Sequence, residues 1–292
     1  MTGSMRGRAR WCTAIVTLAF ALSFARAEDL FRPTFVSEVG PPDQNVILPL
    51  LKAACGEGVR TVTTKGRNAF GCGDASMNEI LASRHGTRPY PWMPYVLWEA
   101  DGVIFGHFLS PTSEDAAINC FGCESHPSLF GGTLLLTKKA GDWIAVWYMS
   151  GIITRHCRRV SLATGRQILF CEATDGGMGH SFHMLYTVDF TTPQFAWDSV
   201  VLMADSYNSL MHGGVQTQSI DRVSFEETGQ SSLLVRVHAR HGRIDLRPDY
   251  NGERLPKPKL SNYEVDFRLD GEVFKVTRET SSSAKLFGVR SR

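Results

Sequence analysis

The 292-residue sequence has no apolar stretch of the length that a transmembrane helix needs. Its longest uncharged, mostly apolar run covers residues 11–25, which is shorter than the about 20 residues that cross a bilayer as a helix. Later stretches of comparable length all contain a charged residue or a glycine. The sequence therefore predicts no membrane span in the mature chain.

Several motifs of well-known binding sites and active sites are also missing. The sequence has neither a Gly-rich phosphate loop followed by Lys and Ser or Thr nor a dinucleotide-binding glycine motif after a strand. Because Gly-x-Ser-x-Gly is absent, His212-Gly213-Gly214, which is similar to an oxyanion loop of esterases, lacks its nucleophile. Cys120 and Cys123 lack the following His of a haem attachment motif. We therefore expect no nucleotide-dependent chemistry and no cofactor.

The predicted mature chain carries little net charge. The full sequence has 31 Lys and Arg against 29 Asp and Glu, but residues 1–27 contain four Arg and no acidic residue. Removing those four leaves 27 basic against 29 acidic residues, so the formal charge changes from +2 to −2. A nearly neutral chain offers no basic surface for phosphates, and we expect no nucleic-acid partner.

The first 27 residues have the composition of a secretory signal peptide. Three arginines precede the apolar run, and Ala25-Arg26-Ala27 ends it with small residues where a signal is cleaved. Cys12 lies at the start of the run, so it is interpreted as part of the signal and not as a lipid anchor. We predict a signal peptide at 1–27, with an uncleaved anchor as the alternative, and a secreted or periplasmic mature chain.

Six cysteines remain in the mature chain, and in an exported protein they predict disulfides. Sequence proximity favours the pairs Cys55–Cys72, Cys120–Cys123 and Cys157–Cys171. The last pair would close a hairpin that turns at Thr164-Gly165.

The pair Cys120–Cys123 has two alternatives to a structural disulfide or tight turn. It could exchange disulfides, or it could form a zinc site together with His126. A redox-active Cys-x-x-Cys follows a strand, whereas residues 112–117 are expected to form a helical turn capped by Thr112 or Ser113. We therefore favour the structural role and predict no metal site.

The N-terminal part of the mature chain has helical patterns. Residues 44–55 place apolar side chains at helical spacing, although Pro49 fits only if it lies in the first turn, and Gly56 would end the helix. A second helix is predicted at 75–83, where Ser76 and Glu79 form a capping box.

From about residue 90 the apolar pattern has a period of two, which is typical of strands. Strands are predicted at 143–148, 182–190, 233–237 and 263–269, and Asp270-Gly271 turns the last one into a hairpin with 273–277. The run at 143–148 is apolar on both faces and predicts a central strand. Residues 247–261 are expected to form an exposed loop.

These patterns predict a mainly β fold. Short strands separated by Gly, Asp and Asn favour an antiparallel β-sandwich or propeller-like stacked sheets, with a short helical N-terminal section. We expect residues 28–292 to form a single domain, in which a helical and loop section at 28–89 packs on the antiparallel sheets of 90–292.

Acidic residues and histidines gather between positions 172 and 212. Glu172 and Asp175 could point into a shared cleft with Asp189, as the carboxylates of glycosidases do. His180, His183 and His212 could join them, although strand alternation would place 180 and 183 on opposite faces. The alternative is that these side chains are solvated surface groups.

A proline-rich segment at residues 88–95 stiffens a group of aromatic residues. Together with Trp98, the residues Tyr90, Trp92 and Tyr95 would form an exposed stacking platform for a sugar ring or a peptide. Buried, they would instead seal the junction between the helical and β sections, and this second interpretation is favoured.

Each candidate active site lacks a required partner. We therefore predict a non-catalytic binding or structural protein with a glycan or a protein as its ligand. The alternative is a secreted hydrolase that uses the acids and histidines between residues 172 and 212.

Overall fold

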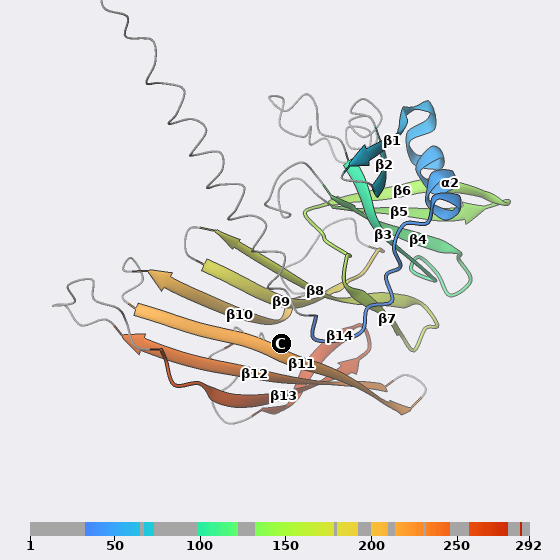
Figure 1. The fold of residues 1–292 in the computed structure, drawn as a ribbon. Helices are drawn as coiled ribbons and strands as arrows, with labels where there is room; N and C mark the ends of the chain where they lie inside the picture. The colour runs from blue at the N-terminus through green and yellow to red at the C-terminus, as the bar shows by residue number, and fades with distance from the viewer. Residues whose placement is uncertain are drawn as a thin grey trace, which may run out of the picture. The chain divides into compact units, whose positions relative to one another are not determined.

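Two antiparallel sheets, in which each strand pairs with its neighbours in the sequence, make up most of the computed structural model (Figure 1). The structure describes residues 33–64, 67–72, 98–121, 132–177, 180–191, 200–209, 214–229, 232–245, 257–279 and 287. The predicted signal peptide, the predicted helix at 75–83 and most of the predicted loop at 247–261 lie outside these ranges. Their assignments stay predictions.

Helix α2 (Gln44–Cys55) has the predicted bounds. The side chain of Asp43 caps it by accepting a 2.8 Å hydrogen bond from Asn45 N, and Gly56 ends it with φ at 55°. The sequence pattern allowed Pro49 only in the first turn of the helix, but Pro49 lies inside the helix, beyond that turn. The helix tolerates the proline because it buries a full apolar face, made by Ile47, Leu50, Leu51 and Cys55. A short 3₁₀ turn, η1 (Gly56–Gly58), follows.

The first sheet has six strands in sequence order. They are β1 (Val59–Thr64), β2 (Arg67–Cys72), β3 (Trp98–Gly106), β4 (Asp115–Phe121), β5 (Gly132–Lys139) and β6 (Asp142–Ser150). Helix α2 packs on one face of this sheet and shares an apolar cluster with residues of β2 to β6. Strands β1 and β2 lie within the section predicted as helical and loop, where the sequence pattern did not indicate them.

The predicted helical turn at residues 112–117 is wrong, because β4 begins at Asp115. The side chain of Asp115 instead holds the turn before β4, because its carboxylate accepts hydrogen bonds from the backbone N of Phe108 at 2.7 Å and of Leu109 at 2.8 Å. Ala116 then pairs with both β3 and β5 in the core. Tertiary pairing overrides the local capping pattern here.

The predicted central position of residues 143–148 is also wrong. Strand β6 stands at the end of its sheet and pairs with β5 alone among the described strands. Its two faces are both apolar because Trp143 packs on the α2 side, whereas Trp147 packs in the cluster between the two sheets. Burial on two faces thus does not require a strand on each side.

The second sheet is an eight-stranded meander. Its strands are β7 (Cys157–Ser161), β8 (Gln167–Gly177), β9 (His180–Val188), β10 (Val200–Ser209), β11 (Gly214–Gly229), β12 (Ser232–Asp245), β13 (Ser261–Asp270) and β14 (Val273–Glu279). The strands predicted at 182–190, 233–237 and 263–269 correspond to β9, β12 and β13. The predicted hairpin β13–β14 is confirmed, with Gly271 at a φ of 65° in its two-residue loop.

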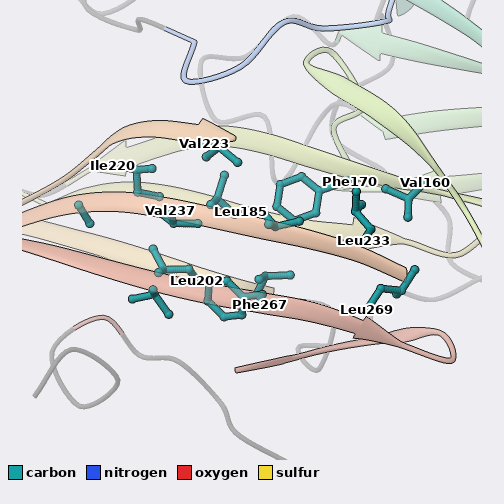
Figure 2. Packing of buried hydrophobic residues seen from close by; sticks show 14 of the residues in the cluster. Val160, Phe170, Leu185, Leu202, Ile220, Val223, Leu233, Val237, Phe267 and Leu269 are labelled. Carbon is teal, nitrogen blue, oxygen red and sulfur yellow. The ribbon is translucent and has the colours of Figure 1, made fainter. Parts of the chain in front are cut away.

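This second sheet curls strongly. The rings of Phe170 in β8 and Phe274 in β14 are 5.4 Å apart, although five strands separate them in the sheet. A flat sheet would separate those strands by about 29 Å. The inner face therefore closes around its own apolar cluster, which takes side chains from β7 through β13 (Figure 2). Arg166 adds an ion pair to Glu272 at 2.6 Å between the β7–β8 and β13–β14 turns.

A third apolar cluster joins the two sheets. It combines Ile104 and Leu135 of the first sheet with Leu169, Cys171 and Tyr186 of the second. This packing confirms the mainly β fold in its sandwich-like form. Residues Thr34–Arg292 form one compact unit.

Candidate functional site

Two of the three predicted disulfides form. Cys55–Cys72 ties the end of α2 to β2, and Cys157–Cys171 joins directly opposed residues of β7 and β8. On the chain-entropy model, loops of this length correspond to about 3 kcal/mol of stabilisation each.

Cys120, near the end of β4, is buried and forms no disulfide with any described residue. Burial raises the pKa of this thiol to about 12, so it carries almost no thiolate at neutral pH. Cys123 and His126 lie outside the described residues, and the Cys120–Cys123 bridge stays a prediction.

Two of the predicted catalytic residues, Glu172 and His183, come together on the inner face of the curled sheet. His183 Nε2 lies 2.6 Å from Glu172 Oε1, across strands β8 and β9. His156 approaches from the residue before β7, with Nε2 at 3.6 Å from Glu172 Oε2. The Glu172 side chain is 0% exposed and each histidine side chain 15%. A buried carboxylate thus has two imidazoles beside it.

The remaining partner of Glu172 comes from far away in the sequence. Thr34 N donates to Glu172 Oε2 at 3.0 Å, and the two residues are 138 positions apart. Thr34 begins the strap, by which we mean residues 34–40, an extended segment that precedes α2. His156 Nε2 also lies 2.9 Å from Phe35 O, to which it donates a hydrogen bond. The cluster of Glu172, His156 and His183 therefore anchors the strap.

Its hydrogen bonds limit what this cluster can do chemically. The Glu172 oxygens accept from a backbone N–H and from His183, so in this conformation they have no approach for a substrate. His156 Nε2 uses its proton on the Phe35 carbonyl and is not presented as a metal ligand. Within the described ranges, no group of three or more His, Cys, Asp or Glu could hold a metal ion.

Sequence reasoning missed His156, although a signal for it was available. If Cys157 and Cys171 are cross-strand partners in an antiparallel pair, then positions 156 and 172 face each other by register. Glu172 N indeed donates to His156 O at 2.9 Å. The predicted disulfide therefore already implied this neighbour of Glu172.

The other predicted catalytic residues do not join this cluster in the described parts of the chain. Asp175 is three positions from Glu172 in β8, so strand alternation places it on the opposite face. Asp189 pairs with Arg166 at 2.6 Å. His180 begins β9 opposite Gly177, but its side chain is not described, and His212 lies outside the described residues.

Trp98 begins β3, whereas Tyr90, Trp92 and Tyr95 of the predicted platform lie outside the described residues. The platform therefore stays a prediction.

A different pair of aromatic rings is present on the first sheet, and sequence reasoning missed it. Phe105 in β3 and Trp143 in β6, called the aromatic pair below, have ring centroids 6.0 Å apart. Phe105 is 38% exposed. No spacing in the sequence signals this pair, because only the strand order brings β3 and β6 onto one sheet.

Two ion pairs flank the aromatic pair. Lys138 Nζ lies 5.7 Å from the centre of the Trp143 ring and 2.9 Å from Glu114 Oε1. Next to Phe105, Arg159 donates to Phe105 O at 3.1 Å and to Glu38 Oε2 at 2.7 Å. The rings are thus bordered by charged donors and acceptors.

The fold and the two disulfides define the chain as a disulfide-bonded, sandwich-like antiparallel β protein, which is consistent with an extracellular protein. No protein-family model, no curated protein and no solved structure matches the chain. Of the helices described, none is both long and apolar enough to span a membrane.

Proposed function

We propose that the protein is an exported, non-catalytic binding protein that recognises a glycan at the aromatic pair. The observation that carries this proposal is the pair Phe105–Trp143, in which Phe105 is 38% exposed and Trp143 is half-buried, with an ion pair beside each of the two residues. The apolar C–H face of a sugar ring stacks on aromatic rings, whose faces are partly negative. The flanking Lys138–Glu114 and Arg159–Glu38 pairs supply donors and acceptors for sugar hydroxyls.

A glycan fits this surface better than a protein partner does. A stable protein interface buries about 1,200–2,000 Å² and centres on a contiguous apolar patch. Large exposed apolar side chains of the described residues are instead spread over separate elements: Val36, Val46, Phe105, Ile144, Leu260 and Val273. A ligand of the size of one or two sugar rings needs only the aromatic pair.

The buried cluster argues against the hydrolase alternative. A glycosidase acid must reach the glycosidic oxygen, yet the Glu172 side chain is 0% exposed and hydrogen-bonded to Thr34 N. Its position is explained by the strap that it holds.

The test is binding of the oxidised full chain to a panel of oligosaccharides, followed by calorimetric titration of each ligand found. Trp143→Ala and Phe105→Ala should each weaken binding by about tenfold or more, as expected for central aromatic anchors. Ile144→Ala is the matched control, because Ile144 is 43% exposed and adjacent to Trp143 but on the other face of β6. Unchanged affinity in Trp143→Ala, or no oligosaccharide bound, would overturn the proposal.

A further inference from the structure

The strap is hydrogen-bonded to strands of both sheets. Thr34 O accepts from Val223 N in β11 at 3.1 Å, and Glu38 N donates to Cys157 O in β7 at 2.8 Å. At its far end, Gly40 exchanges two 3.0 Å backbone bonds with Val103 in β3. A segment close to the N-terminus of the folded unit thus closes contacts between strands far apart in the sequence.

The strap is anchored at the Cys157–Cys171 disulfide. Ser37 Oγ lies 3.2 Å from both the N and the O of Cys157. The remaining anchors, His156 and Glu172, are the immediate chain neighbours of the two half-cystines. These three anchors of the strap therefore lie within one residue of the disulfide.

The same strap also reaches the aromatic pair. Glu38 accepts from both Arg159 N at 3.2 Å and Arg159 Nε at 2.7 Å, and Arg159 in turn donates to Phe105 O. Gly40 pairs with Val103, two residues before Phe105. Docking of the strap thus orders the backbone that presents one of the two rings.

We propose that the Cys157–Cys171 disulfide is a redox-dependent latch for the strap, and that the latched strap orders the aromatic pair for ligand binding. Strand β7 has five residues and pairs with β8 alone among the described strands, so the disulfide holds the end of this hairpin in register. With two thiols in its place, the Cys157 end of the hairpin frays and the anchors of the strap separate. The effect on ligand binding rests on the proposed function; the latch itself does not.

The redox step is a thiol–disulfide exchange. The two thiols of Cys157 and Cys171 give two electrons and two protons to a disulfide-bearing oxidant, which leaves as a dithiol. The S–S bond forms between the two cysteines while that of the oxidant breaks. The strap would then dock only after the chain has reached an oxidising compartment.

Hydrogen exchange at three amides reports the latch directly. The amides of Glu38, Val103 and Val223 each take part in a bond between the strap and a strand. In Cys157→Ser/Cys171→Ser, all three should exchange about tenfold faster or more, because the strap opens locally. The matched control is Cys55→Ser/Cys72→Ser, which removes a disulfide of similar loop length, with sequence separations of 17 and 14, between α2 and β2, which take no part in the strap hydrogen bonds given above. Equal acceleration in both variants, or none in the first, would overturn the latch.

Ser37→Ala provides a second test that keeps both disulfides intact. It removes the side-chain bonds to Cys157 and should accelerate exchange at Glu38 and Val223 while leaving the amides of β12 and β13 protected. No acceleration at Glu38 would show that the strap is not held through Cys157, which also overturns the latch.

The link from the latch to ligand binding has its own test. Titration of each variant with an oligosaccharide that the oxidised chain binds should give weaker binding for Cys157→Ser/Cys171→Ser. If the oxidised chain binds no oligosaccharide, the proposed function fails while the exchange result still decides the latch.

Discussion

Replacing Glu172 by Ala tests whether its buried carboxylate stabilises the fold. The substitution removes the acceptor of two buried donors, Thr34 N at 3.0 Å and His183 Nε2 at 2.6 Å. It also removes the negative charge near His156. Because the side chain is 0% exposed, water does not replace these interactions without opening the structure.

The expected magnitude follows from the two donors. A buried donor that loses its partner costs about 1–3 kcal/mol, so two such donors cost about 4 kcal/mol together. For a folded unit of this size, a loss of about 4 kcal/mol corresponds to a fall in Tm of about 10 °C. Glu172→Gln keeps the shape and one acceptor oxygen and should lose about 1–2 kcal/mol.

The assay is denaturant unfolding of the oxidised chain, followed by tryptophan fluorescence and checked by calorimetry. Glu114→Ala is the control, because that carboxylate is 59% exposed and its pair with Lys138 should contribute at most about 1 kcal/mol. If Glu172→Ala destabilises the protein no more than Glu114→Ala does, the carboxylate does not anchor the strap and the reasoning is refuted.

Two further predictions concern a buried cation and a buried thiol. Burial opposes the ionisation of Asp189, but hydrogen bonds from Arg166 and Thr191 outweigh it and lower its pKa from the ordinary 3.8. The stabilisation of the fold by the ionised Asp189 is present above pH 3.8 and is lost as the pH falls through the lowered pKa. Arg166→Met should therefore lower the free energy of unfolding by about 2 kcal/mol near neutral pH and by less near about pH 3, as measured from urea midpoints. An equal loss at both pH values would contradict this. Burial raises the pKa of Cys120 from 9.0 to about 12, so a thiol-alkylating reagent should leave Cys120 unlabelled in the folded chain, as mass spectrometry would show. Labelling of the folded chain would contradict this burial, whereas labelling after unfolding without reductant would contradict the predicted Cys120–Cys123 bridge.

Local patterns in the sequence predicted several elements correctly. Helix α2 follows from its apolar spacing and its ending glycine, and strands β9, β12 and β13 follow from period-two alternation. The two observed disulfides follow from proximity, since short loops close at low entropic cost. In all these cases the residues that decide the structure are close together in the chain.

The misassigned elements depended on distant partners. Residues 112–117 have a helical cap pattern, but Ala116 pairs with strands on both sides. The apolar run of β6 indicates burial on two faces, yet β6 lies at the end of its sheet because the next strand, β7, belongs to the second sheet. Neither the pairing of residues 115–117 in a strand nor the position of β6 in its sheet can be deduced from the local spacing of apolar residues.

The candidate site divides in the same way. The sequence by itself determined a β-rich, disulfide-bonded chain and placed Glu172 and His183 among five candidate catalytic residues, because composition and alternation are properties of short segments. Only the tertiary structure decided that Thr34, 138 residues from Glu172, occupies its carboxylate, and that Phe105 and Trp143 meet beside two ion pairs. The physical reason is that a hydrogen bond or a ring contact depends on distance in space, and sheet order and curvature set that distance.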